Sequence, residues 1–421
     1  MAEINTRSPY FITKSNAILG SCDLKLWVYT GSPNTSLPST TPTYTLRSTA
    51  TLSNSVPTVT FEVAELIKDL IPAGFNGTYP PNETDPNLYG AVWVDYQIIQ
   101  NFTDGTSTPS NVIGVKGYTG YGYFSQGANP QYVDPKCMQS NKTIVKPSNA
   151  PLRIAVKANK SDVLVNMTYK GNLVYEQVVK TATDSKDLIQ MVTQGGANMS
   201  ISNNGWDNYF SKIQSLSDSK PAFYTGSPAY NSLSNNEILF PVDRVEIMNN
   251  EDVSGSAAGV QVINVINESV CEYDPYKVTF YNKYGALQDF WFFKNSVLKM
   301  KSKKTNFKRN ILQGNNYNTY SHQKTTMEVN AMESLRLNSG WVTEDQNVVI
   351  EEMLLSESLW ISFPNKENYN SSFGWASTDN YKTLPVQLKT SSFTFKNSKT
   401  DGLINHSIDF EFANDKINNI R

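Results

Sequence analysis

Residue types that carry out catalysis or hold metals are few in this chain. The histidines are His322 and His406, and the cysteines are Cys22, Cys137 and Cys271. A zinc site needs three or four nitrogen, sulfur or carboxylate ligands, usually in close pairs, and no His or Cys pair has that spacing. Three distant cysteines do not make a disulfide framework either. We therefore predict no metal site and no catalytic triad, with both histidines at the surface and the cysteines buried.

Glycoside hydrolysis is the one enzymatic class that the composition leaves open, because two carboxylates suffice for it. The best candidates are Asp95, in a strand-like run rich in aromatic residues, and Asp289, beside Phe290 and Trp291. Single acidic residues next to aromatics are common on the faces of β-sandwiches. We expect a protein without enzymatic activity and without a cofactor, and keep a carboxylate-dependent polysaccharide depolymerase as an alternative.

A basic run is the strongest charge signal, and no acidic residue occurs between Asp289 and Glu328. Alternation in a strand would place three of its ammonium groups on one face. The simplest interpretation is a solvated hairpin or an edge strand that its lysines protect from aggregation. The functional alternative is contact with an acidic neighbouring subunit, or with DNA passing through a central channel. The run consists of Lys299, Lys301, Lys303, Lys304, Lys308 and Arg309.

The segment from Gly117 to Phe124 alternates glycine with tyrosine. Such a segment could stack bases or sugars on its rings. Alternatively, its glycines allow close packing while its tyrosines fill the gap to the next domain. Only Lys116 borders the segment and no arginine is near to hold a phosphate backbone, so the packing interpretation is favoured.

The elements that must position these residues are mostly strands. Charged residues make up 18% of the chain, below the roughly 25% of an average domain, and Asn, Ser, Thr, Tyr and Phe take their place. At 421 residues, two or three domains are expected. We predict a mainly β protein of three domains. Residues 1–130 form a β-sandwich-like domain with a short helix at 62–71, residues 131–270 form a second one with a polar excursion at 195–234, and residues 271–421 form an α+β domain.

Local patterns define single elements within the first two domains. Leu24 and Leu26 alternate with Lys25 and Trp27, which predicts a strand with one inward face. The segment Tyr169–Asn172 has the pattern of a hairpin turn. The short helix carries an apolar stripe at i, i+3, i+4, i+7, i+8 spacing, formed by Val63, Leu66, Ile67, Leu70 and Ile71.

The third domain is organised around a predicted helix at residues 343–356. Thr343 and Gln346 have the spacing of a capping box. The apolar side chains recur at i,i+4 spacing, so one face of the helix is expected to cover a sheet. That face consists of Val349, Ile350, Met353 and Leu354.

The bulk properties favour neither a nucleic-acid partner nor a membrane. The formal net charge is −2, and no run of apolar residues is long enough to span a bilayer. The N-terminal residues lack the basic and apolar regions of a secretory signal. We expect no signal peptide and no membrane insertion.

Four stretches resemble virion proteins of tailed phages that infect Bacteroidota. Three lie in the last domain, at Cys271–Lys294, Leu335–Val342 and Ile408–Arg421, and Phe61–Ile71 resembles the first domain of such proteins. The resemblance implies a structural tail, tail-hub or baseplate subunit that works in a symmetric ring. Its partners would be copies of itself and other virion proteins, with passing contact to DNA. It carries no catalytic residues, and it places the protein in virions assembled in the host cytoplasm.

Interfaces of this kind draw on buried aromatic anchors. The candidates for this role are Phe290, Trp291, Trp341 and Trp360. A host-glycan or receptor-binding protein, or a fibre adaptor, is the alternative function. Its contact surface would be the segment Gly117–Phe124.

Overall fold

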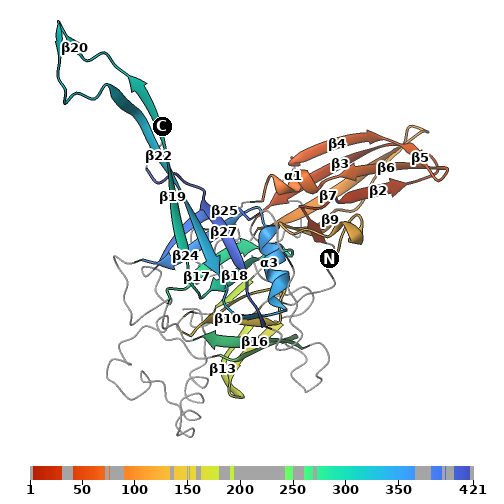
Figure 1. Cartoon of the computed structure of the whole chain (residues 1–421). Coiled ribbons are helices and arrows are strands. Elements are labelled where there is room, and N and C mark those ends of the chain that lie inside the picture. The colour runs from red at the N-terminus through yellow and green to blue at the C-terminus, as the bar shows by residue number, and fades with distance from the viewer. Residues whose placement is uncertain are drawn as a thin grey trace.

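The computed structural model describes residues 3–30, 41–71, 75, 90–132, 137–148, 150, 152–157, 163–179, 190–193, 242–249, 260–268, 273–365, 381–390, 394 and 403–417. The predicted mainly β fold is confirmed. The polar excursion predicted at 195–234 and Cys271 lie outside the described residues. The strands form separate sheets in the first, middle and last thirds of the chain, which we call the first, second and third units (Figure 1).

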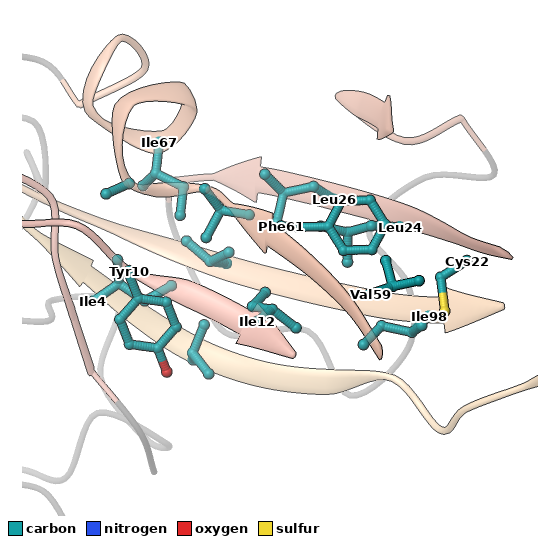
Figure 2. Close-up of a cluster of buried hydrophobic side chains, with 14 of the residues drawn as sticks. Ile4, Tyr10, Ile12, Cys22, Leu24, Leu26, Val59, Phe61, Ile67 and Ile98 are labelled. Carbon is teal, nitrogen blue, oxygen red and sulfur yellow. The ribbon is translucent and has the colours of Figure 1, made fainter. Parts of the chain in front are cut away.

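The first unit consists of two sheets that face each other. The larger sheet has the order β1-β9-β7-β3-β4, with β8 paired to β7, and the smaller has the order β2-β6-β5. Alternation along β3 turns Leu24 and Leu26 inward, where they share a core with Ile12 and Phe61 from the smaller sheet (Figure 2). The strands are β1 (Glu3–Asn5), β2 (Phe11–Ser15), β3 (Leu19–Tyr29), β4 (Tyr44–Thr49), β5 (Thr51–Ser53), β6 (Val56–Glu62), β7 (Ala91–Phe102), β8 (Ser107–Pro109) and β9 (Ile113–Tyr118).

The helix of the first unit, α1 (Ala64–Lys68), is shorter than the predicted 62–71. At its start, Glu62 still belongs to strand β6. At its end, the amides of Leu70 and Ile71 bond three residues back instead of four, so the last turn tightens and the α-helix stops. The predicted apolar stripe still holds, because Ile67 is completely buried in the core.

The second unit also pairs a larger sheet with a smaller one, in the orders β10-β16-β15-β12-β13 and β11-β14. The hairpin predicted around Tyr169–Asn172 is confirmed, since Lys170 and Gly171 connect β12 to β13. Their φ angles of 48° and 76° are those that a two-residue hairpin turn requires. The strands are β10 (Thr143–Pro147), β11 (Arg153–Val156), β12 (Val163–Tyr169), β13 (Asn172–Val179), β14 (Gln190–Thr193), β15 (Arg244–Asn249) and β16 (Gln261–Glu268).

The third unit is a seven-stranded antiparallel sheet in the order β18-β17-β24-β25-β27-β22-β19, and helix α3 (Gln346–Leu354) packs on it. The predicted apolar face is confirmed for Val349, Ile350 and Met353, which are buried against sheet residues such as Phe410. The strands are β17 (Tyr276–Tyr281), β18 (Leu287–Phe292), β19 (Val297–Lys308), β20 (Leu312–Gln313), β21 (Asn316–Tyr317), β22 (Lys324–Asn338), β23 (Val342–Thr343), β24 (Leu359–Pro364), β25 (Tyr381–Leu388), β26 (Leu403–Ile404) and β27 (Ser407–Phe412).

The predicted capping box at the start of α3 is wrong. Thr343 pairs with Leu403 in the short ladder between β23 and β26, so it cannot serve as the N-cap. Its hydroxyl donates to the carboxylate of Asp345, which itself makes no capping hydrogen bond. The Gln346 amide instead donates to the carbonyl of Thr143, at 2.6 Å, and joins the helix to the second unit.

Candidate assembly surface

Two strands of the third unit continue far beyond the sheet to which they belong. β19 pairs with β22 from Val297–Arg336 to Lys308–Lys324, whereas β22 pairs with β27 only over Ser334–Asn338. We call residues 297–338 the arm, and the rest of the chain the body. The arm stands clear of the body, with the β20–β21 turn at its tip (Figure 1). Because a strand rises about 3.4 Å per residue, β19 spans roughly 40 Å.

The base of the arm is fixed to the body by polar contacts with the end of the chain. Arg336 donates two hydrogen bonds to Asp409, at 2.7 and 2.8 Å. Lys416 bonds through its backbone amide to the carbonyl of Ala331 and through its ammonium to Glu333, at 3.0 Å. Among the described residues, no hydrogen bond or ion pair joins the arm to the body beyond Asn330. From there outward the arm is held by its own pairing.

The arm carries many large apolar side chains that are exposed to solvent. Every residue of β19 is exposed. Apolar side chains usually gather on surfaces of this kind where another molecule binds. The exposed ones are Val297, Leu298, Met300, Phe307, Leu312, Tyr317, Tyr320, Met327, Val329 and Met332.

The predicted basic run lies on the arm, and its first part follows the predicted alternation. Lys299, Lys301 and Lys303 are alternate residues of β19 and therefore share a face. The register places Ser334, Met332 and Asn330 of β22 opposite them on that face. Within the described part of the chain, Lys301 and Lys303 form no ion pair.

The remaining basic residues of the run lie elsewhere on the arm. Lys304 lies on the opposite face, across from Val329. Lys308 ends the strand, beyond a bulge between Thr305 and Asn306. Arg309 donates to the carbonyl of His322 and closes the base of the tip loop. The basic side chains thus surround the ribbon instead of forming a single stripe.

The predicted aromatic anchors occupy different environments. Phe290 is buried in the core of the third unit, in edge contact with Phe292. Trp291 is buried with Ala150 where the second and third units meet. Both rings are buried by other residues of the same chain, so they are not exposed to a partner.

The other two anchors differ in exposure. Trp360 is half-buried, and its ring contacts those of Phe75 and Tyr281 at centroid distances of 5.5 and 6.0 Å. Trp341 is 67% exposed. Of the four candidates, Trp341 is the one whose ring is available to a partner.

The Gly117–Phe124 segment lies where the three units meet. Tyr118 is completely buried among residues of all three, and Tyr121 is buried as well. A Cβ on Gly120 would come within 2.5 Å of Asn5 and 2.7 Å of the Lys283 carbonyl. The packing interpretation therefore agrees with the structure, and a stacking platform built from Tyr118 and Tyr121 does not. The aromatic ring left fully exposed is Phe124.

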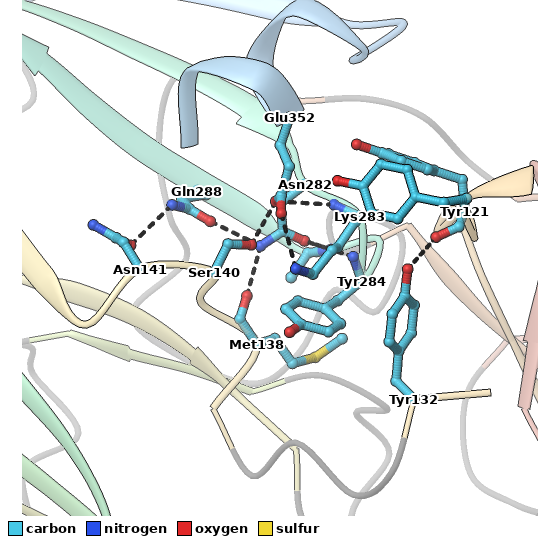
Figure 3. Close-up of polar contacts among 12 residues, drawn as sticks. Tyr121, Tyr132, Met138, Ser140, Asn141, Asn282, Lys283, Tyr284, Gln288 and Glu352 are labelled. Atoms are coloured by element: carbon cyan, nitrogen blue, oxygen red, sulfur yellow. Dashed lines mark hydrogen bonds and ion pairs between the residues drawn. The ribbon is translucent and has the colours of Figure 1, made fainter. Parts of the chain in front are cut away.

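A buried polar network joins helix α3 to the second unit (Figure 3). Glu352, completely buried on α3, pairs with Lys283 at 3.2 Å and accepts a hydrogen bond from Ser140. Burial raises the pKa of Glu352, and the Lys283 ammonium opposes that shift. Asn282, beside Lys283, donates to the carbonyl of Met138 at 2.6 Å. Because these groups satisfy one another across the junction, the units are held in one arrangement.

The N-terminal segment forms a second tie across the junction. β1 adds to the edge of the first sheet beside β9, and Glu3 pairs with the buried Lys157 of the second unit at 2.6 Å. Arg7 donates to the carbonyl of Leu355, just after α3, and pairs with Glu357 at 3.2 Å. One short segment thus contacts all three units.

The carboxylates considered for glycoside hydrolysis are both engaged by neighbouring side chains. Asp95 accepts a hydrogen bond from the Tyr29 hydroxyl at 3.0 Å, and burial raises the pKa of its carboxyl group. Asp289 accepts one from Thr279 at 2.6 Å and lies 3.5 Å from Arg153. They come from different units, on strands β7 and β18. Among the described residues, no three His, Cys, Asp or Glu side chains gather as metal ligands would.

The prediction that His406 lies at the surface is wrong. Its side chain is buried and its Nε2 lies 3.0 Å from the Asn347 amide oxygen on α3. Its backbone amide bonds to Ser339. The sequence around His406 does not indicate this burial, because its partners Ser339 and Asn347 come from distant parts of the chain. His322, in contrast, lies on the arm and is exposed, as predicted. Cys22 and Cys137 are buried free thiols, as predicted.

In the comparisons with known proteins, no family model and no curated protein matches this chain. No helix in the described part of the chain is long and apolar enough to cross a membrane.

Proposed function

We propose that this protein is a non-enzymatic structural subunit of a phage virion. It would act as a tail, tail-hub or baseplate ring component that assembles with copies of itself and docks neighbouring virion proteins. The observation that carries the proposal is the arm, because a projecting ribbon covered with apolar and basic side chains suits contact with another protein.

The polar contacts at the junction between the units support the same function. An assembly subunit must present its surfaces at fixed angles, because small errors in orientation prevent a ring from closing. Here the hydrogen bonds of Glu352 with Ser140 and of Asn282 with Met138, together with the N-terminal segment, tie the units together. The resemblance of the third unit to virion proteins of tailed phages points in the same direction.

The proposal is tested by the mass of the purified full chain in solution, measured by multi-angle light scattering, with negative-stain imaging of the same sample. We expect closed oligomers whose mass is a fixed multiple of the 47.1 kDa chain. A monomer at every concentration, including in mixtures with other virion proteins, would contradict it.

A further inference from the structure

We propose that the arm of each copy is covered by the body of the next copy, in a head-to-tail contact between a basic ribbon and an acidic body. This inference rests on the proposed function, since it requires that the chain assembles with itself. It adds that the arm of one copy meets the body of the next.

The first argument is that the arm lacks the cover that such a ribbon needs. Two-stranded β-ribbons are only marginally stable in water on their own, and gain stability from a third strand or a packed face. Beyond the Ser334–Glu411 pair, no described strand lies beside β22 except β19. Leu298 and Met300 lie on the face that continues the buried Leu335 of the core, yet both are exposed.

The second argument is the distribution of charge. The arm holds eight Lys and Arg residues and two Glu residues, so its formal charge is +6. The whole chain carries −2, so the body carries −8. Two copies therefore attract each other when the arm of one meets the body of the other, and this attraction also orients their encounter.

The third argument weighs against side-by-side pairing of two arms through β19. This strand forms one open edge of the arm and is rich in lysine. Two β19 edges brought side by side would oppose Lys299, Lys301 and Lys303 to the same residues of another arm. Like charges facing each other across strands are destabilising, and lysines on an edge strand commonly prevent such pairing.

The fourth argument concerns DNA, which a basic ribbon can also bind in the major groove. Phosphate contacts explain exposed lysines but not the apolar side chains between them. On the arm, Met332 lies directly opposite Lys301, and Val329 opposite Lys304. A protein surface with acidic and apolar residues complements both kinds of side chain.

A contact between arm and body uses two different surfaces of the same molecule. Such a heterologous contact leaves one free arm and one free body at the ends of every chain of copies. Repetition of the contact closes into a ring if the rotation allows it. A closed ring of this kind is the assembly that the proposed function requires.

The decisive experiment mixes two forms of the protein. In the armless variant, residues 300–333 are replaced by an Asn-Gly turn that joins Lys299 to Ser334, which are paired in the native hairpin. The armless variant should not assemble with itself, because no copy has an arm. An affinity-tagged armless variant should nevertheless retain the untagged full chain, whose arm can bind the armless body.

A second variant keeps the arm and changes only its charge, so that a loss of assembly cannot be attributed to a folding defect of the armless variant. It carries Lys301→Gln, Lys303→Gln, Lys304→Gln and Lys308→Gln, all at exposed strand positions. We expect its subunit affinity to weaken by about tenfold or more, since several charge pairs are lost together. The control carries Lys14→Gln, Lys25→Gln and Lys142→Gln on the body, and should assemble as tightly as the unmodified chain or more tightly.

The remaining outcomes each overturn the inference in a recognisable way. If the armless variant assembles like the full chain, the inference fails and the proposed function stands. If it binds neither itself nor the full chain, the contact is between arms. If the full chain stays monomeric and its arm lysines are needed to bind a fluorescent DNA duplex, the partner is nucleic acid. If the full chain binds no duplex and is monomeric also in mixtures with other virion proteins, the proposed function fails as well.

Discussion

Arg336 of β22 and Asp409 of β27 form a two-pronged ion pair at the point where the arm leaves the sheet, with hydrogen bonds of 2.7 and 2.8 Å. The planar guanidinium fits the carboxylate at both nitrogens, so the pair fixes direction as well as distance. The two residues face each other in the β22–β27 register, two residues before its last pair, Ser334–Glu411. The angle at which the arm projects is therefore fixed by the β22–β27 pairing, by this ion pair and by the Lys416–Glu333 contact.

Replacing Asp409 with Asn should loosen the base of the arm with little loss of global stability. The pair is partly exposed, so we expect the free energy of unfolding to fall by less than about 1 kcal/mol. Amide hydrogen exchange in Val297–Lys299 and Ser334–Asn338 should accelerate. Unchanged exchange there would show that the ion pair does not fix the arm.

The same pair predicts a pH dependence. The hydrogen bonds from Arg336 lower the pKa of the Asp409 carboxyl group. A lowered carboxyl pKa contributes stability at neutral pH that is lost as the pH falls through the folded-state pKa, below about pH 4. The difference in stability between the unmodified chain and Asp409→Asn should therefore vanish in acid, as measured by urea unfolding at neutral and at acidic pH.

Lys277 gives a second pH dependence, and here burial is the main cause of the lowered pKa. Its side chain is completely buried, 3.9 Å from Asp289 and over the ring of Tyr381. Burial lowers its pKa to about 7, with Asp289 opposing the shift and Arg153 adding to it. Between that value and the ordinary lysine pKa, the unfolded chain binds more protons than the folded one. Stability should therefore rise with pH above neutrality.

The Lys277→Met variant tests this directly, because it keeps the length of the side chain and removes its titration. We expect the thermal unfolding midpoint of the unmodified chain to rise relative to that of the variant as the pH is raised from about 6 to about 9. A constant difference between the two midpoints would mean that Lys277 keeps an ordinary pKa in the folded state.

Gly285 is predicted to be essential to the junction between the units. It has a φ of 80°, and a Cβ there would lie 2.8 Å from the backbone nitrogen of Thr119. Gly105 has a similar φ of 85°, but a Cβ there would meet no atom within 4 Å. Gly105→Ala therefore reports the backbone cost alone, about 1 kcal/mol. Gly285→Ala should lower the free energy of unfolding by roughly 2 kcal/mol more than Gly105→Ala does, since backbone atoms must move. Equal losses of stability for the two variants in chemical denaturation would refute this prediction.

Trp341 and Trp360 should respond differently to substitution by alanine. Trp360 fills a contact between Phe75 and Tyr281, so its loss should lower the free energy of unfolding by about 2 kcal/mol. Trp341 is largely exposed, so Trp341→Ala should leave the unfolding of the monomer unchanged and weaken subunit association. The two variants are compared by thermal unfolding and by sedimentation. Equal assembly with and without the Trp341 ring would remove it from the interface.

Local patterns predicted a large part of the fold. Alternation in Leu24 and Leu26, the turn at Lys170–Gly171 and the apolar face of α3 depend on neighbours in sequence, and all three are confirmed. Each of these patterns reports a single strand, turn or helix. The sequence is informative wherever one element alone decides which side chains are buried.

Features set by distant contacts were not predictable in this way. The start of α3 depends on Thr343 pairing with Leu403, and the burial of His406 depends on Asn347. The basic run predicted a solvated hairpin or an edge strand, but nothing in it shows that β22 loses its other neighbour beyond Ser334. Only the assembled sheet reveals that the lysines lie on a projecting arm. The burial of Phe290 likewise depends on strands and a helix that are distant in sequence and cover it in the core.

The most direct test of the account compares the mass in solution of the full chain with that of the armless variant, at equal concentration and low ionic strength. The account predicts a closed oligomer for the full chain and a folded monomer for the armless variant. It also predicts that added salt dissociates the oligomer, because the contact pairs a basic arm with an acidic body. Identical masses for the two proteins would contradict the claim that the arm builds the assembly.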